Sequence, residues 1–186
     1  MSVNRRTFLA AGMATSGLAA LPAMAQLRIE ITGVGANQLP IAIPQFQGTR
    51  DAPVDLAQVI TADLERSGAF RAIRVMGEVP AEDVSAPRGA FWQKMGASAL
   101  VVGQIVRASE TRLEVEYRLV DTVKNAVIDQ KRYVATPTDL RLTAHQIADA
   151  IYEKLTGEGG IFASRLAYVL QRGPHDYELV VADSDG

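Results

Sequence analysis

Several short stretches of the chain alternate hydrophobic and polar residues, which is the pattern of a β-strand with one buried face. The first covers residues 26–32, where leucine or isoleucine occupies every second position. The other stretches that we predict to be strands are residues 39–46, 70–75, 99–106, 113–119 and 126–135. Residues 99–106 are apolar on both faces, so we expect a central strand there. Pro40 and Pro44 should confine residues 39–46 to a sheet edge or a bulge, because proline lacks a backbone donor.

Two longer stretches repeat apolar residues at helical spacing. Residues 54–67 carry one apolar stripe and are followed by glycine, a frequent helix stop. Residues 137–155 carry a second stripe, with Thr136 as a candidate N-cap and Pro137 at the first helical position. Two further features lie between them, namely a loop over residues 77–89 and a short helix over residues 90–95.

These elements together predict a mixed β-sheet with packed helices, an α/β domain over residues 38–160. Residues 157–160 read as a glycine-rich linker at the end of this domain. Residues 161–186 read as a β-hairpin that turns around Gly173 and Pro174. Because a two-stranded hairpin is marginal by itself, we expect either that it docks on the domain or that it belongs with further strands.

The first 25 residues have the three-part layout of a cleavable export signal. Its parts, in order, are the basic pair Arg5 and Arg6, the apolar residues 8–21, and the cleavage site between Ala25 and Gln26. Residues 4–9 also resemble the twin-arginine motif, in which paired arginines precede Phe-Leu. An ordinary general-secretion signal with a chance arginine pair is the alternative. The apolar stretch is too short to span a bilayer and is interrupted by glycine, serine and threonine.

Composition narrows the function classes for the processed chain. Subtracting 25 from 186 residues leaves 161, which is enough for one domain with a sizeable core. Loss of the two arginines shifts the formal net charge from −2 to about −4, so nucleic acid and anionic membrane surfaces are not expected partners. The chain has no cysteine, which excludes disulfides and thiol chemistry. After signal cleavage we expect no membrane insertion, because no later segment is long and apolar enough.

Motifs for catalysis, cofactors or metals are weak. His145 lies beside the apolar stripe of residues 137–155, and we interpret it as a partly exposed helix residue; a catalytic base or metal ligand is the less favoured alternative. His175 lies in the hairpin turn and should be solvated. Residues 183–186 read Asp-Ser-Asp-Gly, a fragment of a calcium loop that is more typical of a simple turn. The sequence therefore predicts no catalytic site, no cofactor and no metal, and favours a binding or scaffold role.

The order of short motifs along the chain resembles a known family. The matching stretches are residues 27–31 (LRIEI), 39–46 (LPIAIPQF), 62–70 (ADLERSGAF), 99–103 (ALVVG), 117–121 (YRLVD), 152–157 (YEKLTG), 165–169 (RLAYV), 177–179 (YEL) and 183–186 (DSDG). Their succession over essentially the whole processed chain is similar to the amino-terminal part of TolB, the periplasmic component of the Tol–Pal system. The resemblance implies a non-enzymatic periplasmic adaptor that maintains the outer membrane and supports envelope constriction at cell division.

In the TolB family a β-propeller follows the α/β domain, and residues 161–186 resemble its opening strands. The chain stops where the first blade has barely begun, which leaves a truncated product, a fragment and a stand-alone adaptor as interpretations. The family binds Pal, the peptidoglycan-associated lipoprotein, mainly through the propeller. Pal is therefore a doubtful partner for these 186 residues.

The resemblance further implies that residues 26–37 form an arm, with a strand over 26–32 and a hinge over 33–37, that binds the C-terminal domain of TolA. The partner-binding residues carried over by position are Gln26, Leu27, Arg28, Ile29, Glu30, Ile31 and Thr32. An alternating strand beside a flexible spacer is suited to adding onto an exposed sheet edge. The alternative is that residues 26–32 form the first strand of the domain's own sheet, and in a switch both arrangements can hold at different times.

Two other functions stay open from the sequence. One is a periplasmic hydrolase that uses His145, which would lose its activity in a His145→Ala variant. The other is a structural module of a different envelope assembly, which would recover unrelated partners in a pull-down.

Overall fold

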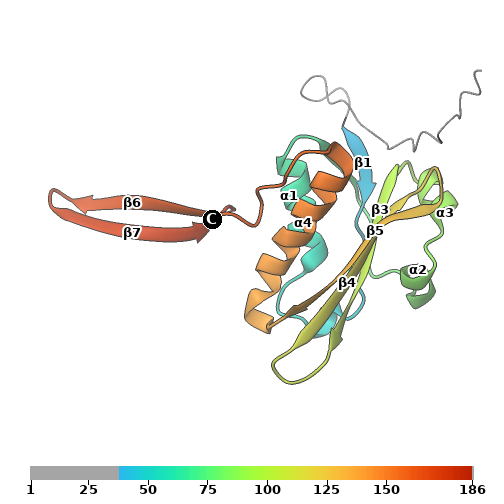
Figure 1. Cartoon of the computed structure of the whole chain (residues 1–186), viewed down its shortest axis with the longest axis horizontal. Coiled ribbons are helices and arrows are strands. Elements are labelled where there is room, and N and C mark those ends of the chain that lie inside the picture. Colours follow the sequence, from blue (N-terminus) through green and yellow to red (C-terminus); the bar gives the residue numbers. More distant parts are fainter. Residues whose placement is uncertain (1–37, 186) are drawn as a thin grey trace, which may run out of the picture.

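The computed structural model describes residues 38–185, and the predictions that concern residues 1–37 lie outside this range. Within it, the chain forms a five-stranded sheet with helices on both faces and a separate two-stranded hairpin that extends away from them (Figure 1). The predicted fold class, a mixed β-sheet with packed helices followed by a hairpin, is confirmed.

The sheet combines parallel and antiparallel pairing. Its strands are β1 (Leu39–Ala42), β2 (Phe70–Ile73), β3 (Ala99–Arg107), β4 (Leu113–Asp121) and β5 (Ala126–Ala135). They lie in the order β2-β1-β3-β4-β5, with β1 parallel to both of its neighbours and the remaining pairs antiparallel. The first five residues of β3 are all buried, as the continuous apolar pattern predicts for a central strand. Along β4 every second side chain is buried, which follows from the strict alternation in its sequence.

Helices cover both faces of this sheet. The longer pair, α1 (Leu56–Arg66) and α4 (Leu140–Thr156), packs on one face, and the shorter pair, α2 (Ala81–Ser85) and α3 (Gly89–Lys94), covers the other (Figure 1). Two short 3₁₀ helices precede the longer pair: η1 (Thr49–Asp51) and η2 (Pro137–Asp139). The larger core lies under α1 and α4 around Phe46, Tyr117 and Ile147. The smaller core lies under α2 and α3 around Trp92 and Leu100.

The ends of the two long helices follow from local chemistry. Asp55 caps α1, because its carboxylate accepts the backbone N–H of Gln58 at 3.3 Å. Gly157 ends α4 with φ +81°, a left-handed conformation that glycine adopts without a steric cost. Thr136 lies at the start of η2, but its hydroxyl donates to the Asp139 carboxylate at 2.5 Å and caps no backbone N–H.

Two predictions about this part of the chain are wrong. β1 is a central strand although it contains Pro40. Pro40 precedes the first β1–β3 pair, Ile41 with Ala99, so its missing N–H falls outside that ladder. Residues 77–89 are also more than a loop, because they contain the helix α2.

The hairpin consists of β6 (Arg165–Gly173) and β7 (Asp176–Asp183), paired antiparallel. Most of its large apolar side chains are exposed, namely Leu166, Tyr168, Val169, Leu170, Tyr177, Leu179 and Val181. The hydrogen bonds that tie it to the α/β domain lie at its base, so the two strands project from that point (Figure 1). Among the described helices, none has the length and apolar character that crossing a membrane requires.

Candidate functional site: a polar face of α4 at the base of the hairpin

The site residues predicted from the sequence fall outside the described part of the chain. This holds for the partner-binding residues 26–32, for the cleavage site between Ala25 and Gln26, and for Arg5 and Arg6. Those assignments therefore stay predictions. The described residues offer a different feature, which is a row of polar side chains on α4 that faces the base of the hairpin.

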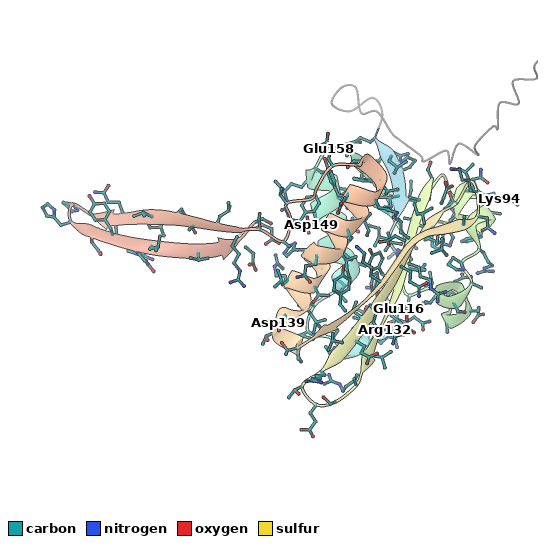
Figure 2. The ribbon with its side chains drawn as sticks, viewed as in Figure 1. Lys94, Glu116, Arg132, Asp139, Asp149 and Glu158 are labelled. Atoms are coloured by element: carbon teal, nitrogen blue, oxygen red, sulfur yellow. The ribbon has the colours of Figure 1, made fainter. Side chains whose placement is uncertain are left out.

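Three residues make up this row: Arg141, His145 and Asp149. Their spacing of four residues places them one above the other on the helix surface. Figure 2 labels Asp149 on α4, close to where the chain passes toward the hairpin. The first two side chains contact the segment that follows β7, and the third contacts the segment that precedes β6.

His145 is the centre of the row and is fully buried. Its Nδ1 lies 2.6 Å from Oδ2 of Asp63 on α1, and its Nε2 lies 3.7 Å from Oδ2 of Asp185. The interpretation of His145 as a partly exposed helix residue is therefore wrong. Both carboxylates come from segments distant in sequence, one from the packed helix α1 and one from the residues after β7, and together these segments cover the imidazole.

Arginines on both helices form ion pairs with the two carboxylates and partly neutralise their charge. Arg66 Nη2 lies 3.4 Å from Oδ1 of Asp63, and Arg141 forms an ion pair and hydrogen bond with Asp185. Burial raises the pKa of Asp63, and the hydrogen bond and charge of His145 oppose this effect. The 2.6 Å separation from His145 makes this a short hydrogen bond between two buried groups.

Not every polar atom of this cluster has a partner. His145 Nε2 and Asp185 Oδ1 are buried, and neither forms a hydrogen bond with the described part of the chain. A buried polar atom without a partner carries a desolvation cost of about 1–3 kcal/mol. Among the described residues, the contact between α4 and the end of the hairpin is thus incompletely bonded.

The cluster has the composition of a metal site, since donor atoms of Asp63, His145 and Asp185 lie within 4.8 Å of one another. The geometry favours an ion-pair network instead. The two carboxylates approach opposite ring nitrogens, and a metal ion can bond only one of these. The guanidinium of Arg141 already neutralises Asp185 and would repel a cation beside it.

The hydrolase alternative requires His145 to act as a base on an accessible nucleophile. The imidazole is 0% exposed, and its two nitrogens face carboxylates rather than a hydroxyl. Ser184 is the nearest serine in sequence to this contact, and its hydroxyl donates to the backbone carbonyl of Phe162 at 2.6 Å. A substrate would have no route to the buried ring. The arrangement is suited instead to holding α1, α4 and the end of the hairpin together.

Asp149 holds the other end of the hairpin. Its Oδ1 accepts the N–H of Phe162 at 2.7 Å, and its Oδ2 accepts the N–H of Ala163 at 3.1 Å. The ring of Phe162 is buried and meets Tyr152 edge to face, with 5.7 Å between centroids. The entry to β6 is therefore anchored by two hydrogen bonds and one aromatic contact.

A sequence signal for part of this site exists. Asp63 occupies a position on the apolar stripe of α1, one residue before Leu64 and three after Ile60, where a carboxylate needs a buried partner. The four-residue spacing of Arg141, His145 and Asp149 is also visible in the sequence. Neither signal identifies the partners, because these come from other elements.

Comparison with known proteins identifies the family. The family model described as the TolB amino-terminal domain matches residues 27–128, more than half of the chain. The chain belongs to the TolB amino-terminal domain family. The resemblance found in the succession of sequence motifs is thereby confirmed.

Curated relatives with the name "Tol-Pal system protein TolB" match nearly the whole chain. Identity is 44% over 170 residues in Albidiferax ferrireducens, 43% over 185 in Polaromonas naphthalenivorans and 48% over 169 in Bordetella avium. These matches cover 91%, 100% and 91% of this chain, and 40%, 42% and 38% of the respective relatives. The crystal structure of TolB from Acinetobacter baumannii superimposes with a TM-score of 0.68 at 32% identity, over 87% of this chain and 40% of that one. The chain thus spans less than half the length of these TolB proteins.

Proposed function

We propose that the chain acts as a non-enzymatic, periplasmic adaptor of the Tol–Pal system, which helps to maintain the outer membrane and supports constriction at cell division. The observation that carries the proposal is the match to TolB proteins along essentially the whole chain, in sequence and in fold. The buried, carboxylate-flanked histidine supports the non-enzymatic part, because no substrate reaches it.

The arm formed by residues 26–32 is the part that we expect to bind TolA. Its strand would add to an edge of the TolA C-terminal domain, with backbone hydrogen bonds for affinity and Leu27, Ile29 and Ile31 in alternate pockets. In this proposal the amino terminus created at Gln26 matters, because an uncleaved signal would block the arm.

Titration of the TolA C-terminal domain tests the arm. Deletion of residues 26–32 should abolish binding, and replacing the three apolar residues with serine should weaken it at least about tenfold, the equivalent of 1.4 kcal/mol. The matched control replaces Arg28 and Glu30, on the opposite face of the same strand, with alanine. Unchanged affinity after the deletion would remove TolA binding by the arm from the proposal.

Export is tested separately. Replacement of Arg5 and Arg6 by lysine should stop export if the signal is of the twin-arginine type. Full export of that variant would favour the general-secretion alternative and leave the periplasmic location intact.

Pal binding is not part of the proposal for residues 1–186, because the family uses its propeller for Pal. A pull-down with the processed chain should therefore recover TolA and not Pal. Recovery only of proteins outside the Tol–Pal system would instead support the structural module of another envelope assembly.

A further inference from the structure

We propose that the polar row on α4 is a two-point clamp on the hairpin, and that its two points differ in strength. The entry point is Asp149 with the segment before β6, and the exit point is Arg141 and His145 with the segment after β7. Release of the exit point lets the β6–β7 hairpin swing about the entry point, so the clamp sets the direction in which the chain leaves the α/β domain.

The entry point is fully bonded. Both carboxylate oxygens of Asp149 accept backbone N–H groups, and these groups belong to consecutive residues, Phe162 and Ala163. Gly160 passes so close to this carboxylate that a Cβ there would lie 2.3 Å from Oδ1 of Asp149. Two hydrogen bonds, a buried aromatic ring and a close backbone approach make this point a suitable pivot.

The exit point is weaker. Asp185 has one bonded partner, the half-exposed side chain of Arg141, and its Oδ1 has no partner among the described residues. The imidazole of His145 lies 3.7 Å from the carboxylate, beyond hydrogen-bonding distance. Because this contact depends on one half-exposed arginine, whereas the entry point has two backbone hydrogen bonds and a buried ring, the exit point opens before the entry point does.

The two points are also connected to each other at the base of the hairpin. Ser184, next to Asp185, donates its hydroxyl to the carbonyl of Phe162 at 2.6 Å. This bond keeps the exit segment at the base of the hairpin when the exit point opens, while Asp149 keeps Phe162 on α4. What changes is the angle between the hairpin and α4, and not the pairing of β6 with β7.

His145 connects the exit point to α1, because its imidazole is hydrogen-bonded to Asp63 on that helix. A shift between α1 and α4 therefore changes the position of the imidazole relative to Asp185. In this way the clamp connects the packing of the helical layer to the direction of the hairpin.

Distance measurements between spin labels test the clamp, and the absence of native cysteine makes labelling specific. Cysteines replace Glu110, in the exposed β3–β4 connection, and His175, at the hairpin tip. The variants Asp185→Ala and Arg141→Met open the exit point. The matched control is Asp176→Ala, which removes an exposed carboxylate from the same hairpin away from α4.

The exit variants should broaden the distance distribution at least about twofold, as expected for a locally released segment, while the control stays as narrow as the unsubstituted chain. Tryptophan fluorescence during urea unfolding should show that the α/β domain stays folded in all of them. Distributions in both exit variants as narrow as that of the unsubstituted chain would overturn the proposal, as would equal broadening in the control. Broadening of the unsubstituted chain on addition of EDTA would also overturn it, because a metal ion rather than the ion pair would then hold the exit point.

Discussion

The linker before the hairpin offers a sharp test, because two adjacent glycines have opposite surroundings. A Cβ added to Gly160 would lie 2.3 Å from Oδ1 and 2.5 Å from Cα of Asp149, whereas one added to Gly159 would meet no described atom within 4 Å. Gly160→Ala should therefore destabilise the protein, and Gly159→Ala should not. The pair forms its own control, because both changes add one methyl group to the same linker.

The size of the difference follows from the contacts. Comfortable contact needs about 3.5 Å or more, so the methyl group added at Gly160 would have to displace the linker or Asp149 by about 1 Å. That shift lengthens the hydrogen bonds that Phe162 and Ala163 donate to Asp149, now 2.7 and 3.1 Å, beyond the usual limit. Because the carboxylate is only half-buried, we assign about 2 kcal/mol to the loss of the pair. The lower entropy of the unfolded chain returns about 0.4–1 kcal/mol in either variant.

Urea unfolding followed by the fluorescence of Trp92, the only tryptophan of the chain, measures the result. With a slope of about 2 kcal/mol per molar urea, the midpoint of Gly160→Ala should lie about 0.5–1 M below that of the unsubstituted chain. Gly159→Ala should match or exceed the unsubstituted chain. Hydrogen exchange at the amides of Phe162 and Ala163 should accelerate only in Gly160→Ala. Equal midpoints and equal exchange in the two variants would refute the reasoning.

Three further predictions use the same unfolding assay. Gly103→Ala should cost about 1–3 kcal/mol or more, because its Cβ would lie 2.4 Å from the ring of Phe46 in the core; a midpoint like that of the unsubstituted chain would contradict this. Burial raises the pKa of the Tyr117 hydroxyl in the folded protein. The stability that this group contributes is therefore present below pH ~10, where the unfolded chain is also neutral, and is lost as the pH rises above that value. Tyr117→Phe should reduce this loss of stability when the unfolding midpoints at pH 8 and pH 11 are compared. His145→Leu should cost about 3–5 kcal/mol, because it leaves Oδ2 of the buried Asp63 without its hydrogen-bond partner. Replacing both residues with leucine should recover most of that loss. Additive effects in the double-mutant cycle would show that the two side chains do not interact.

Most of the elements could be predicted from the sequence because their patterns are local. Alternation in β4 and the apolar stripes of α1 and α4 determine which side of each element is buried, and the sheet brings those sides together. One end of each long helix is also determined by local chemistry, because Asp55 caps the start of α1 and Gly157 ends α4, each within one turn. The ends of the observed elements differ from the predicted ones by a few residues, where pairing with other strands decides.

The sequence-based predictions are wrong where a segment distant in sequence determines the pairing or burial of a residue. The sequence predicts Pro40 to be an edge residue because proline lacks a backbone donor. The pairing of β1 with β3 begins one residue after Pro40, at Ile41, so the missing donor has no consequence. His145 reads as half-exposed because its own helix leaves that side uncovered. Its burial depends on Asp63 and on the segment that ends in Asp185, which no helical periodicity can reveal.

The polar cluster around His145 affects two properties differently, namely the stability of the domain and the direction of the hairpin. A buried histidine and carboxylate add little net stability, since an apolar pair of similar volume often packs as well. The leucine pair could not supply the contact with Asp185, because among the described residues the imidazole of His145 and the guanidinium of Arg141 are the groups on α4 that face that carboxylate. The leucine pair should thus recover most of the unfolding midpoint while leaving the ion pair with Arg141 as the described contact of Asp185 on α4. Stability of the domain and direction of the hairpin are therefore separable properties of the same face of α4.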